Sequence, residues 1–361
     1  MNKPKSVTLD DVARHAGVSY QTVSRVLNQA AQVAEKTRER VEAAMRELNY
    51  VPNRMAQQLA GKRSFTLGLA STNLALNAPS QGASAIKSRA SQLGYHVVIS
   101  MVEDLQLQSC RAAVNELIAQ RVDGILINVP LDTENAHEVK QCCGNLQVLF
   151  LDVDPQTNLF SILFDPLEGA RQGLEHLLGL GHRDIALLTG PLESVSARLR
   201  YEGWLGGLTE NQLDPFSVLH GDWSSASGYQ LALELLNQSQ RPTAILVAND
   251  QMALGVLRAA HQSGINVPQQ LSVVGYDDTE DSAYFQPPLT TIAQDFRLSG
   301  RESVNRMVQA LQHPQQTLPE SLLLHTTLKL RQTTSAPNKQ VDSVLTLADQ
   351  LKIIVRKLEQ L

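Results

Sequence analysis

The chain has 361 residues, of which 43% are hydrophobic, 19% charged and 4% aromatic. This length predicts two or three domains with large apolar cores, and this composition excludes a disordered, collagen-like or disulfide-stabilised protein. The formal charge of −5 is unevenly distributed: residues 1–63 hold 11 Lys and Arg against 6 Asp and Glu, and the remainder holds 20 against 30. A basic first part joined to an acidic remainder indicates that only the first part approaches a polyanion.

Cysteine usage and the first residues bear on the compartment of the protein. Cys110, Cys142 and Cys143 are odd in number and form no CxxC motif, which is typical of reduced, buried thiols. No apolar run approaches the ~20 residues of a membrane helix. The N-terminal residues also lack the apolar stretch of a secretion signal. We therefore expect a cytoplasmic protein that contacts no membrane.

The first fifty residues carry only helical signals. A capping box that starts at Thr8, followed by apolar residues at i, i+3, i+4 and i+7, predicts a helix over 9–16. Gly17 ends this helix, because glycine adopts the left-handed turn at low cost. A second helix follows, capped by Ser19, and then a third amphipathic helix. A short helix over 54–59 precedes a linker.

Two helices joined by a glycine-containing turn are a helix-turn-helix candidate. The second helix turns Val23 and Val26 inward and leaves polar side chains outward: Tyr20, Gln21, Ser24, Arg25 and Asn28. These residue types suit the major groove of DNA, because Arg bonds guanine at two atoms, Gln pairs with adenine, and hydroxyls and amides hold phosphates. From this pattern alone, a generic three-helix bundle is an alternative.

From residue 66 onward, strand and helix patterns alternate. Continuous apolar strands separated by helices predict parallel sheets covered on both faces, and the length of this region indicates two α/β lobes with a cleft. The expected strands are 66–70, 96–101, 124–129, 148–152, 184–189, 243–248 and 271–276. Ligands of such sheets lie at the carboxyl ends of the strands. At these ends the sequence has Asn128, Asp152, Asn249, Asp250, Asp277 and Asp278.

A polar linker, residues 332–343, precedes a heptad pattern at the end of the sequence. The apolar residues step by three and four, as at the a and d positions of a coiled coil: Val344, Leu347, Leu351, Ile354, Leu358 and Leu361. One helix on a polar tether cannot bury this stripe by itself. Self-association through the stripe is therefore expected, with docking onto the chain's own core as the alternative.

Several sequence blocks together resemble the LacI/GalR family of bacterial repressors. The segments VTLDDVA, AGVS and TVSRVLN within residues 7–28 are similar to the N-terminal signature of that family. Further similar blocks are PNRMAQQLAGK at 52–62, SVSARLR at 194–200, VANDQMALG at 247–255 and VVGYDDTEDS at 273–282. The resemblance thus extends over most of the chain.

The resemblance implies a fold and a domain organisation. A small all-α helix-turn-helix headpiece would occupy residues 1–52, and a hinge helix with a linker residues 53–64. An α/β core of two parallel-sheet lobes, like that of periplasmic binding proteins, would bind a sugar and form homodimers through residues 65–331. A linker and a C-terminal coiled-coil helix, residues 332–361, would join dimers into a homotetramer.

For the headpiece, the resemblance implies contacts to a pseudo-palindromic double-stranded operator. Tyr20, Gln21 and Arg25 would read bases, while the hinge helix would insert Leu59, helped by Ala60, into the minor groove and bend the DNA. The other residues expected at the DNA are Thr8, Leu9, Ser19, Thr22, Ser24, Asn28, Thr37, Asn53 and Gln57. So short a hinge helix does not persist alone in water, and its folding would be coupled to binding.

For the core, the resemblance implies a sugar site, and release of a lactose-type operator by a galactoside inducer. A sugar needs hydrogen-bonding groups beside a flat apolar surface. The residues expected to line the site are Leu76, Pro79, Asn128, Asp152, Phe164, Ser196, Arg200, Trp223, Asn249, Asp277, Gln294 and Phe296. Inducer and operator would favour different arrangements of the lobes, so that each weakens the other.

Other functions agree less well with the sequence. An enzyme is not indicated, because the motifs GxGxxG, GxxxxGKS/T, GxSxG and HExxH are absent. Asp277 and Asp278 are adjacent, so that on a strand they would point to opposite faces. No cofactor or metal is expected, since His137, His176 and His182 show no ligand spacing. A periplasmic sugar receptor would need a signal peptide and no headpiece. A regulator of the same family that responds to another sugar, or to a purine co-repressor, is the remaining alternative.

Overall fold

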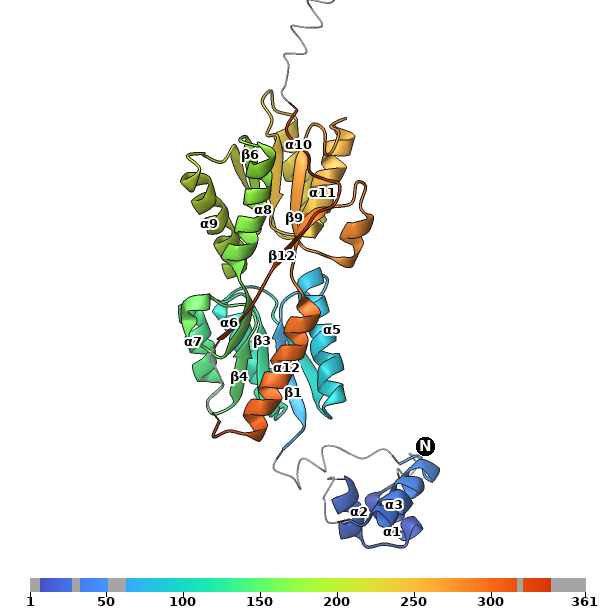
Figure 1. Ribbon diagram of the computed structural model, residues 1–361. Coiled ribbons are helices and arrows are strands. Elements are labelled where there is room, and N and C mark those ends of the chain that lie inside the picture. The colour runs from blue at the N-terminus through green and yellow to red at the C-terminus, as the bar shows by residue number, and fades with distance from the viewer. Residues whose placement is uncertain (1–6, 28–32, 51–62, 317–320, 339–361) are drawn as a thin grey trace, which may run out of the picture. The chain divides into compact units, whose positions relative to one another are not determined.

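The computed structural model describes residues 7–27, 33–50, 63–316 and 321–338. The chain divides into two compact units, Met1–Ser64 and Phe65–Leu361, which Figure 1 traces in chain order. The expected hinge helix over 54–59 and the expected heptad helix beyond residue 343 lie outside the described residues.

The N-terminal unit is a helix-turn-helix followed by a third helix, as the sequence predicts. Its helices are α1 (Leu9–Ala16), α2 (Tyr20–Leu27) and α3 (Glu35–Glu47). Together they bury one apolar cluster of Val12, Ala13, Ala16, Val23, Val26, Val41 and Ala44. A hydrogen bond of 2.6 Å between the side chains of His15 and Glu47 ties α1 to α3.

Local side-chain and backbone signals define the start of α1 and the turn between α1 and α2. Thr8 Oγ1 accepts a hydrogen bond from the Asp11 N–H at 3.3 Å, and the Asp11 carboxylate accepts one from the Thr8 N–H at 3.0 Å. Gly17 ends α1 in the left-handed conformation, with φ 63°. Ser19 Oγ then accepts the Thr22 N–H at 3.2 Å and caps α2. The capping box and the glycine stop are both confirmed.

The second unit contains two six-stranded sheets. The first is formed by β1 (Thr66–Ser71), β2 (His96–Met101), β3 (Gly124–Asn128), β4 (Gln147–Phe150), β5 (Ser161–Phe164) and β11 (Ser321–Leu324), in the order β11-β5-β4-β3-β1-β2. The second is formed by β6 (Ile185–Thr189), β7 (Ser217–His220), β8 (Ala244–Val247), β9 (Ser272–Asp277), β10 (Thr290–Ala293) and β12 (Thr327–Lys329), in the order β12-β10-β9-β8-β6-β7. All ladders between named strands are parallel except that of β10 with β12. The predicted fold class of a helical headpiece and two parallel-sheet lobes is confirmed.

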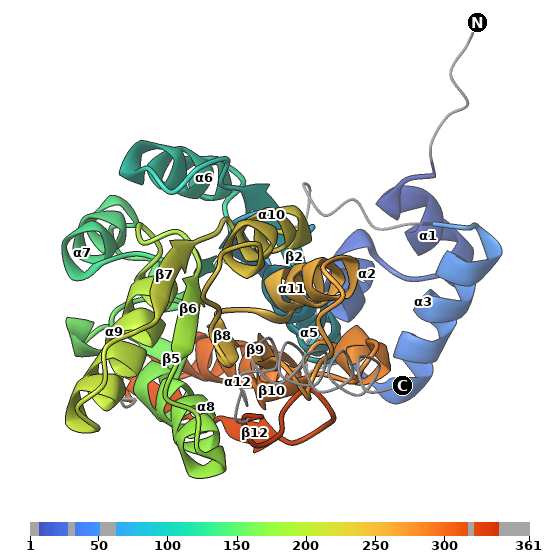
Figure 2. The ribbon, with the colours of Figure 1, turned by 90° about the horizontal axis from the view of Figure 1, so that it is seen from above.

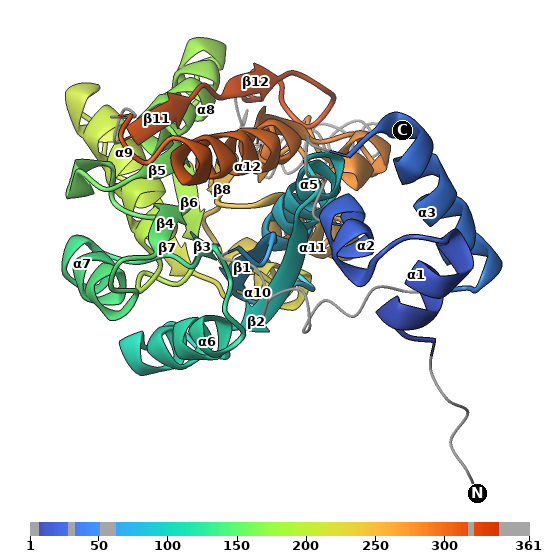
Figure 3. The ribbon, with the colours of Figure 1, turned by 90° about the horizontal axis from the view of Figure 1, so that it is seen from below.

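Helices cover both faces of each sheet. On the first sheet, α5 (Asn77–Gln92) and α12 (Phe296–Gln312) lie on one side, and α6 (Leu107–Ala119) and α7 (Thr133–Cys142) on the other (Figure 3). On the second sheet, α8 (Pro166–Leu180) and α9 (Val195–Glu210) lie opposite α10 (Ser225–Leu236) and α11 (Asp250–Gln262) (Figure 2). Two short 3-10 helices, η1 (Pro155–Thr157) and η2 (Glu280–Tyr284), complete the elements.

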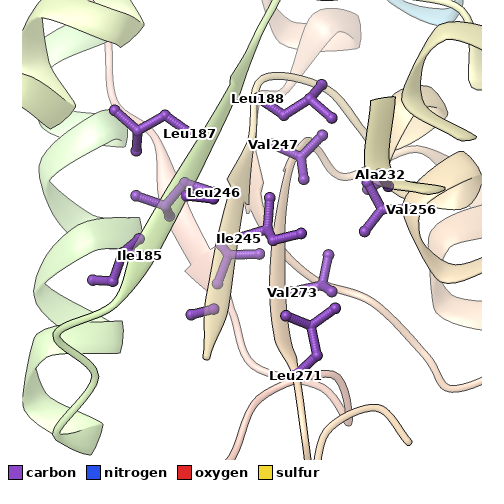
Figure 4. Packing of buried hydrophobic residues seen from close by; sticks show 14 of the residues in the cluster. Ile185, Leu187, Leu188, Ala232, Ile245, Leu246, Val247, Val256, Leu271 and Val273 are labelled. Carbon is purple, nitrogen blue, oxygen red and sulfur yellow. The ribbon is translucent and has the colours of Figure 1, made fainter. Parts of the chain in front are cut away.

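The strands of the second sheet are buried on both faces, which explains their continuous apolar sequences. Ile185, Leu187 and Leu246 point to one side of the sheet, while Ile245 and Val247 point to the other, toward Ala232 and Val256 of the covering helices (Figure 4). All five of these strand residues are at most 1% exposed. No helix of the described residues is long and apolar enough to cross a membrane.

The chain passes between the two lobes three times. It leaves the first sheet after β5, returns after β10 to form α12 and β11, and leaves again to add β12 to the second sheet. The first lobe is therefore assembled from two separate stretches of sequence, and α12 packs directly against α5. The crossings lie at 164–166, 293–296 and 324–327.

The seven expected strands are all present, with ends that differ by at most two residues from the expected bounds. Five further strands, β5, β7, β10, β11 and β12, were not expected. Each is only three or four residues long. Length alone does not explain why they were missed, since β4 and β8 also have four residues and were expected from their apolar sequences.

Candidate functional site

The headpiece presents one polar face of α2 to solvent. Tyr20, Gln21 and Arg25 are exposed, and Tyr20 keeps 51% of its surface accessible. Val23 and Val26, on the opposite face, are buried. The base-reading candidates therefore share a surface that is separate from the core of the unit.

The other DNA-contact candidates occupy several positions around this face. Thr8 and Ser19 are exposed helix caps, Thr22, Ser24 and Thr37 are half-buried, and Leu9 packs against the apolar cluster. The hydroxyls of Ser19 and Thr22 lie 2.9 Å apart and share a hydrogen bond. Five candidates lie outside the described residues, namely Asn28, Asn53, Gln57, Leu59 and Ala60, as do all the heptad positions from Val344 to Leu361.

One cavity of about 160 Å³ lies between the two lobes of the second unit, at the carboxyl ends of both sheets. This volume is more than ten times the roughly 10–15 Å³ that admits one water molecule, so the cavity is large enough for a small molecule. All twelve residues expected at the sugar site line it: Leu76, Pro79, Asn128, Asp152, Phe164, Ser196, Arg200, Trp223, Asn249, Asp277, Gln294 and Phe296.

Arg200, on α9, joins the strand ends that surround the cavity. One guanidinium nitrogen donates to the carbonyl of Ala248, and the other donates to Gln294 Oε1 at 3.1 Å. The guanidinium carbon lies 3.8 Å from the centre of the Tyr276 ring. Arg200 itself is only 7% exposed. These contacts fix a positive charge in the wall of the cavity.

Asp277 faces this arginine without a hydrogen bond. Its Oδ1 lies 3.7 Å from the Arg200 guanidinium, which is an ion pair but too long for a hydrogen bond. Among the described residues that oxygen has no hydrogen-bond partner. Burial raises the pKa of Asp277 to about 7, against the opposing effect of Arg200. A buried carboxylate oxygen at a cavity wall is available to a hydroxyl donor.

A second acid, Asp152, enters the cavity from the first lobe. Burial raises the pKa of Asp152 to about 6, while the charge of Arg200 and a hydrogen bond from Ser196 oppose the rise. Both lobes therefore direct a carboxyl group toward the same arginine. Such a cluster suits a ligand with several hydroxyl groups.

Aromatic rings form the flat part of the cavity. Phe164 and Phe296 meet edge to face, with ring centres 5.4 Å apart, at two of the crossings between the lobes. Trp223 adopts a left-handed backbone with φ 74°. Its carbonyl accepts a hydrogen bond of 3.0 Å from Asn249 Nδ2. A Cβ at Gly190 would overlap the Trp223 ring, so that glycine is required beneath it.

The acids that follow Asn249 and Asp277 serve the fold instead. Asp250 is fully buried and accepts hydrogen bonds from Thr291 Oγ1 at 2.6 Å and from the Thr279 N–H at 2.9 Å. Asp278 pairs with Arg331 at 2.5 Å. Adjacent carboxylates thus have separate partners. For Asp277 and Asp278 this does not come from strand alternation, because Asp278 lies beyond β9 and both residues have a positive φ, of 109° and 56°.

Several residues at the cavity were not singled out from the sequence. Gln251 lines it and accepts a hydrogen bond of 3.0 Å from the Asn77 N–H of the other lobe. Ser194 and Thr72 also line it, and so does Gly82, where the family resemblance implies a looser apolar wall and an altered range of sugars. The sequence carries no pattern for these residues, because a small or amide side chain in an ordinary helix or loop has no distinctive spacing. Among the described residues, no group of three His, Cys, Asp or Glu side chains could hold a metal ion.

Comparison with known proteins finds matches to both units of the chain. Residues 8–53 match the family described as bacterial regulatory proteins, lacI family, and residues 174–334 match a periplasmic binding protein-like domain. The lactose operon repressor of Escherichia coli strain K12 is 57% identical over 357 residues, covering 99% of each chain. The lactose operon repressor of Klebsiella pneumoniae is 44% identical over 354 residues, covering 98% of this chain and 99% of that one.

A solved structure shows the same architecture. The lac repressor dimer bound to operator and the anti-inducer ONPF superimposes with a TM-score of 0.86 at 57% identity, covering 92% of this chain and 100% of that one. Sequence and structure therefore agree over nearly the whole length. The chain belongs to the lacI family of bacterial regulatory proteins.

Proposed function

We propose that the chain is a sequence-specific DNA-binding repressor of a lactose-type operon, released from its operator by a galactoside inducer. The observation that carries this proposal is the cavity in which Asp277 and Arg200 lie beside aromatic rings. A sugar presents hydroxyl groups at its edge and an apolar C–H face, and this cavity offers partners for both. The two relatives named lactose operon repressor supply the choice of a galactoside.

Within the cavity, Arg200, Asp277 and Asp152 would bond the sugar hydroxyls, and Trp223 would cover the C–H face. Asn249 already holds the Trp223 carbonyl and the Met252 N–H, so we assign it mainly to positioning that ring. On α2 of the headpiece, the exposed Tyr20, Gln21 and Arg25 would read bases.

The same architecture supports an allosteric mechanism. The cavity touches both lobes, so an inducer is sensitive to their relative arrangement. Operator would favour one arrangement in a homodimer and inducer another. We further propose a homotetramer through the heptad residues and a cytoplasmic location, where operator DNA lies.

A catalytic role is not part of this proposal. The family is one of regulators, and the matched relatives are named repressors. Within the site, Asp277 and Asp278 have different partners, so they do not form the flanking pair of acids that glycoside hydrolysis needs.

A DNA-binding titration tests the proposal. A labelled duplex carrying a lac-type operator and a duplex of scrambled sequence would be titrated with the full chain by fluorescence anisotropy. Allolactose, ribose and hypoxanthine would be added separately. We expect preference for the operator and release by allolactose alone. Equal retention of the operator with every ligand would contradict the proposal, and tighter binding with hypoxanthine would indicate a purine-responsive regulator.

A further inference from the structure

Gly82 is a gap in the wall of the cavity. It lies within α5, which contributes the apolar wall together with Leu76, Ala78 and Pro79 close to its start. A Cβ built at Gly82 would meet the Asn128 amide nitrogen at 3.8 Å and no other side chain of the described residues within 4 Å. The space that a side chain would occupy there is open.

Neither backbone conformation nor packing demands a glycine at this position. Gly82 is not among the glycines with a left-handed φ. On the neighbouring helix α12, by contrast, a Cβ at Gly300 would lie 2.6 Å from Ala85 Cβ and 3.0 Å from the Gly82 carbonyl oxygen. The close approach of the two helices therefore requires Gly300 and leaves residue 82 free to carry a side chain.

Glycine in a helix interior weakens the helix, because it loses more backbone freedom on folding than alanine does. At Gly82 this loss brings no benefit in turn geometry or helix packing. What the missing side chain does provide is depth in the cavity wall, next to the Asn128 amide, which can donate a hydrogen bond.

We propose that Gly82 is a specificity-determining residue that makes room for the second sugar ring of a disaccharide galactoside. The inference rests on the proposed function and extends it to the size of the ligand. The Arg200 and Asp277 cluster would hold the galactose ring, and the second ring would occupy the recess along α5. The amide of Asn128 favours a ring with hydroxyl groups over a purely apolar group at this place.

Substitution of Gly82 tests this assignment by isothermal titration calorimetry. The probes are allolactose, methyl β-galactoside and ortho-nitrophenyl β-galactoside. We expect Gly82→Leu to weaken allolactose binding by about tenfold or more and to leave methyl β-galactoside within about twofold. Gly82→Ala, which adds one carbon atom, should give a smaller change of the same sign. The measured quantity is the ratio of the two affinities in each variant.

Gly206 provides the matched control. It also lies within a helix, α9, its Cβ would meet no atom within 4 Å, and it does not line the cavity. Gly206→Leu should leave the affinity ratio unchanged. Circular dichroism and thermal unfolding would show that all variants fold.

Four outcomes would overturn the inference. If Gly82→Leu leaves allolactose binding intact, the recess does not hold the second ring. If it weakens allolactose and methyl β-galactoside equally, residue 82 shapes the whole cavity and not its specificity. If it weakens only ortho-nitrophenyl β-galactoside, the recess holds an apolar group. If the wild-type chain binds none of the three galactosides, the proposed function itself fails, together with this inference.

Discussion

At the scale of single residues, the cavity holds an acid whose surroundings do not favour its charge. Asp277 is 6% exposed, has a left-handed φ of 109°, and lacks a hydrogen bond to Oδ1 from the described residues. An unsatisfied buried polar group costs about 1–3 kcal/mol. A residue that lowers stability in this way is expected where binding, and not folding, requires it.

The raised pKa of Asp277 gives a pH-dependent stability with a definite sign. Its pKa rises from an ordinary 3.8 to about 7, so the folded chain holds a proton that the unfolded chain has released. The stabilising contribution is complete below pH 4 and is lost as pH rises through 7, by on the order of a few kcal/mol. We expect Asp277→Asn to remove this loss of stability with rising pH. Urea unfolding between pH 4 and 8 measures the free energy of unfolding of both proteins.

The same Asp277→Asn variant separates stability from binding. It should be more stable than the wild type at pH 8, and it should bind allolactose at least tenfold more weakly, since a hydrogen bond to a charged group contributes about 1.5–3 kcal/mol. Asp152→Asn provides a comparison from the other lobe. Because the pKa of Asp152 is raised to about 6, its contribution to stability is lost as pH rises through 6. Unchanged allolactose affinity would remove Asp277 from the sugar site.

Arg25 is the residue on α2 for which base reading is most specific, because its guanidinium can bond a guanine at two atoms. Arg25→Ala should cost about 1–3 kcal/mol in operator binding and relax discrimination at one base pair. Anisotropy titrations against operators substituted at each position would show this. Arg14→Ala, on the exposed side of α1, is the control and should leave discrimination unchanged. Equal losses on operator and scrambled DNA would exclude a base contact by Arg25.

At the scale of elements, the helix glycines show which contacts are tight. A Cβ at Gly300 would press on α5 at Ala85, whereas a Cβ at Gly206 would enter open space. We expect Gly300→Ala to destabilise the first lobe by about 1–3 kcal/mol through overpacking. Gly206→Ala should instead stabilise the chain by up to about 1 kcal/mol. Chemical unfolding of both variants measures the difference, and the same sign for both would contradict this assignment.

The elements that the sequence predicted are those with strong local signals. Helix α1 has a capping box at Thr8 and a glycine stop at Gly17, and the buried strands have continuous apolar runs. Strands β10 and β12 could not be identified in this way. Their pairing joins Ile292 to Leu328, two residues whose contact depends on the third crossing of the chain. No local pattern encodes such a long-range return.

The residues of the candidate site differ in how far the sequence alone could identify them. Elementary reasoning about strand ends placed Asn128, Asp152 and Asp277 at the carboxyl ends of strands, where the ligands of parallel sheets bind. Arg200 lies in the interior of α9, and only family resemblance pointed to it, because a helical arginine has no distinctive pattern. Gly82 was indicated by the family resemblance alone. Gly190 acts through an absent side chain, which becomes visible only when the neighbouring Trp223 ring is known.

At the scale of the second unit, the cavity and the crossings coincide. Phe164, Gln294 and Phe296 line the cavity, and they lie at the first and second crossings. The hydrogen bond from the Asn77 N–H to Gln251 Oε1 connects the lobes directly at the same place. A ligand in this cavity is therefore in contact with the segments that must change conformation when the lobes move.

Linkage requires this coupling to act in both directions. If allolactose weakens operator binding by some factor, then operator must weaken allolactose binding by the same factor. We expect calorimetric titration of allolactose, with and without saturating operator, to give that factor. Gln251→Ala removes a hydrogen bond between the lobes. It should change the factor by which allolactose and operator weaken each other's binding more than it changes the affinity for operator alone. Identical allolactose affinities in the two titrations would exclude allostery.

The interleaved connectivity also has a consequence for the order in which the protein is made. The cluster on one side of the first sheet is complete by Leu163, but the cluster on the other side needs Val304, Met307 and Val308. The buried cluster of the second lobe is complete by Leu289. A chain emerging from the ribosome folds in the order of its segments. The first lobe is thus synthesised first but completes its core last. Until α12 has been synthesised, one apolar face of the first sheet remains exposed.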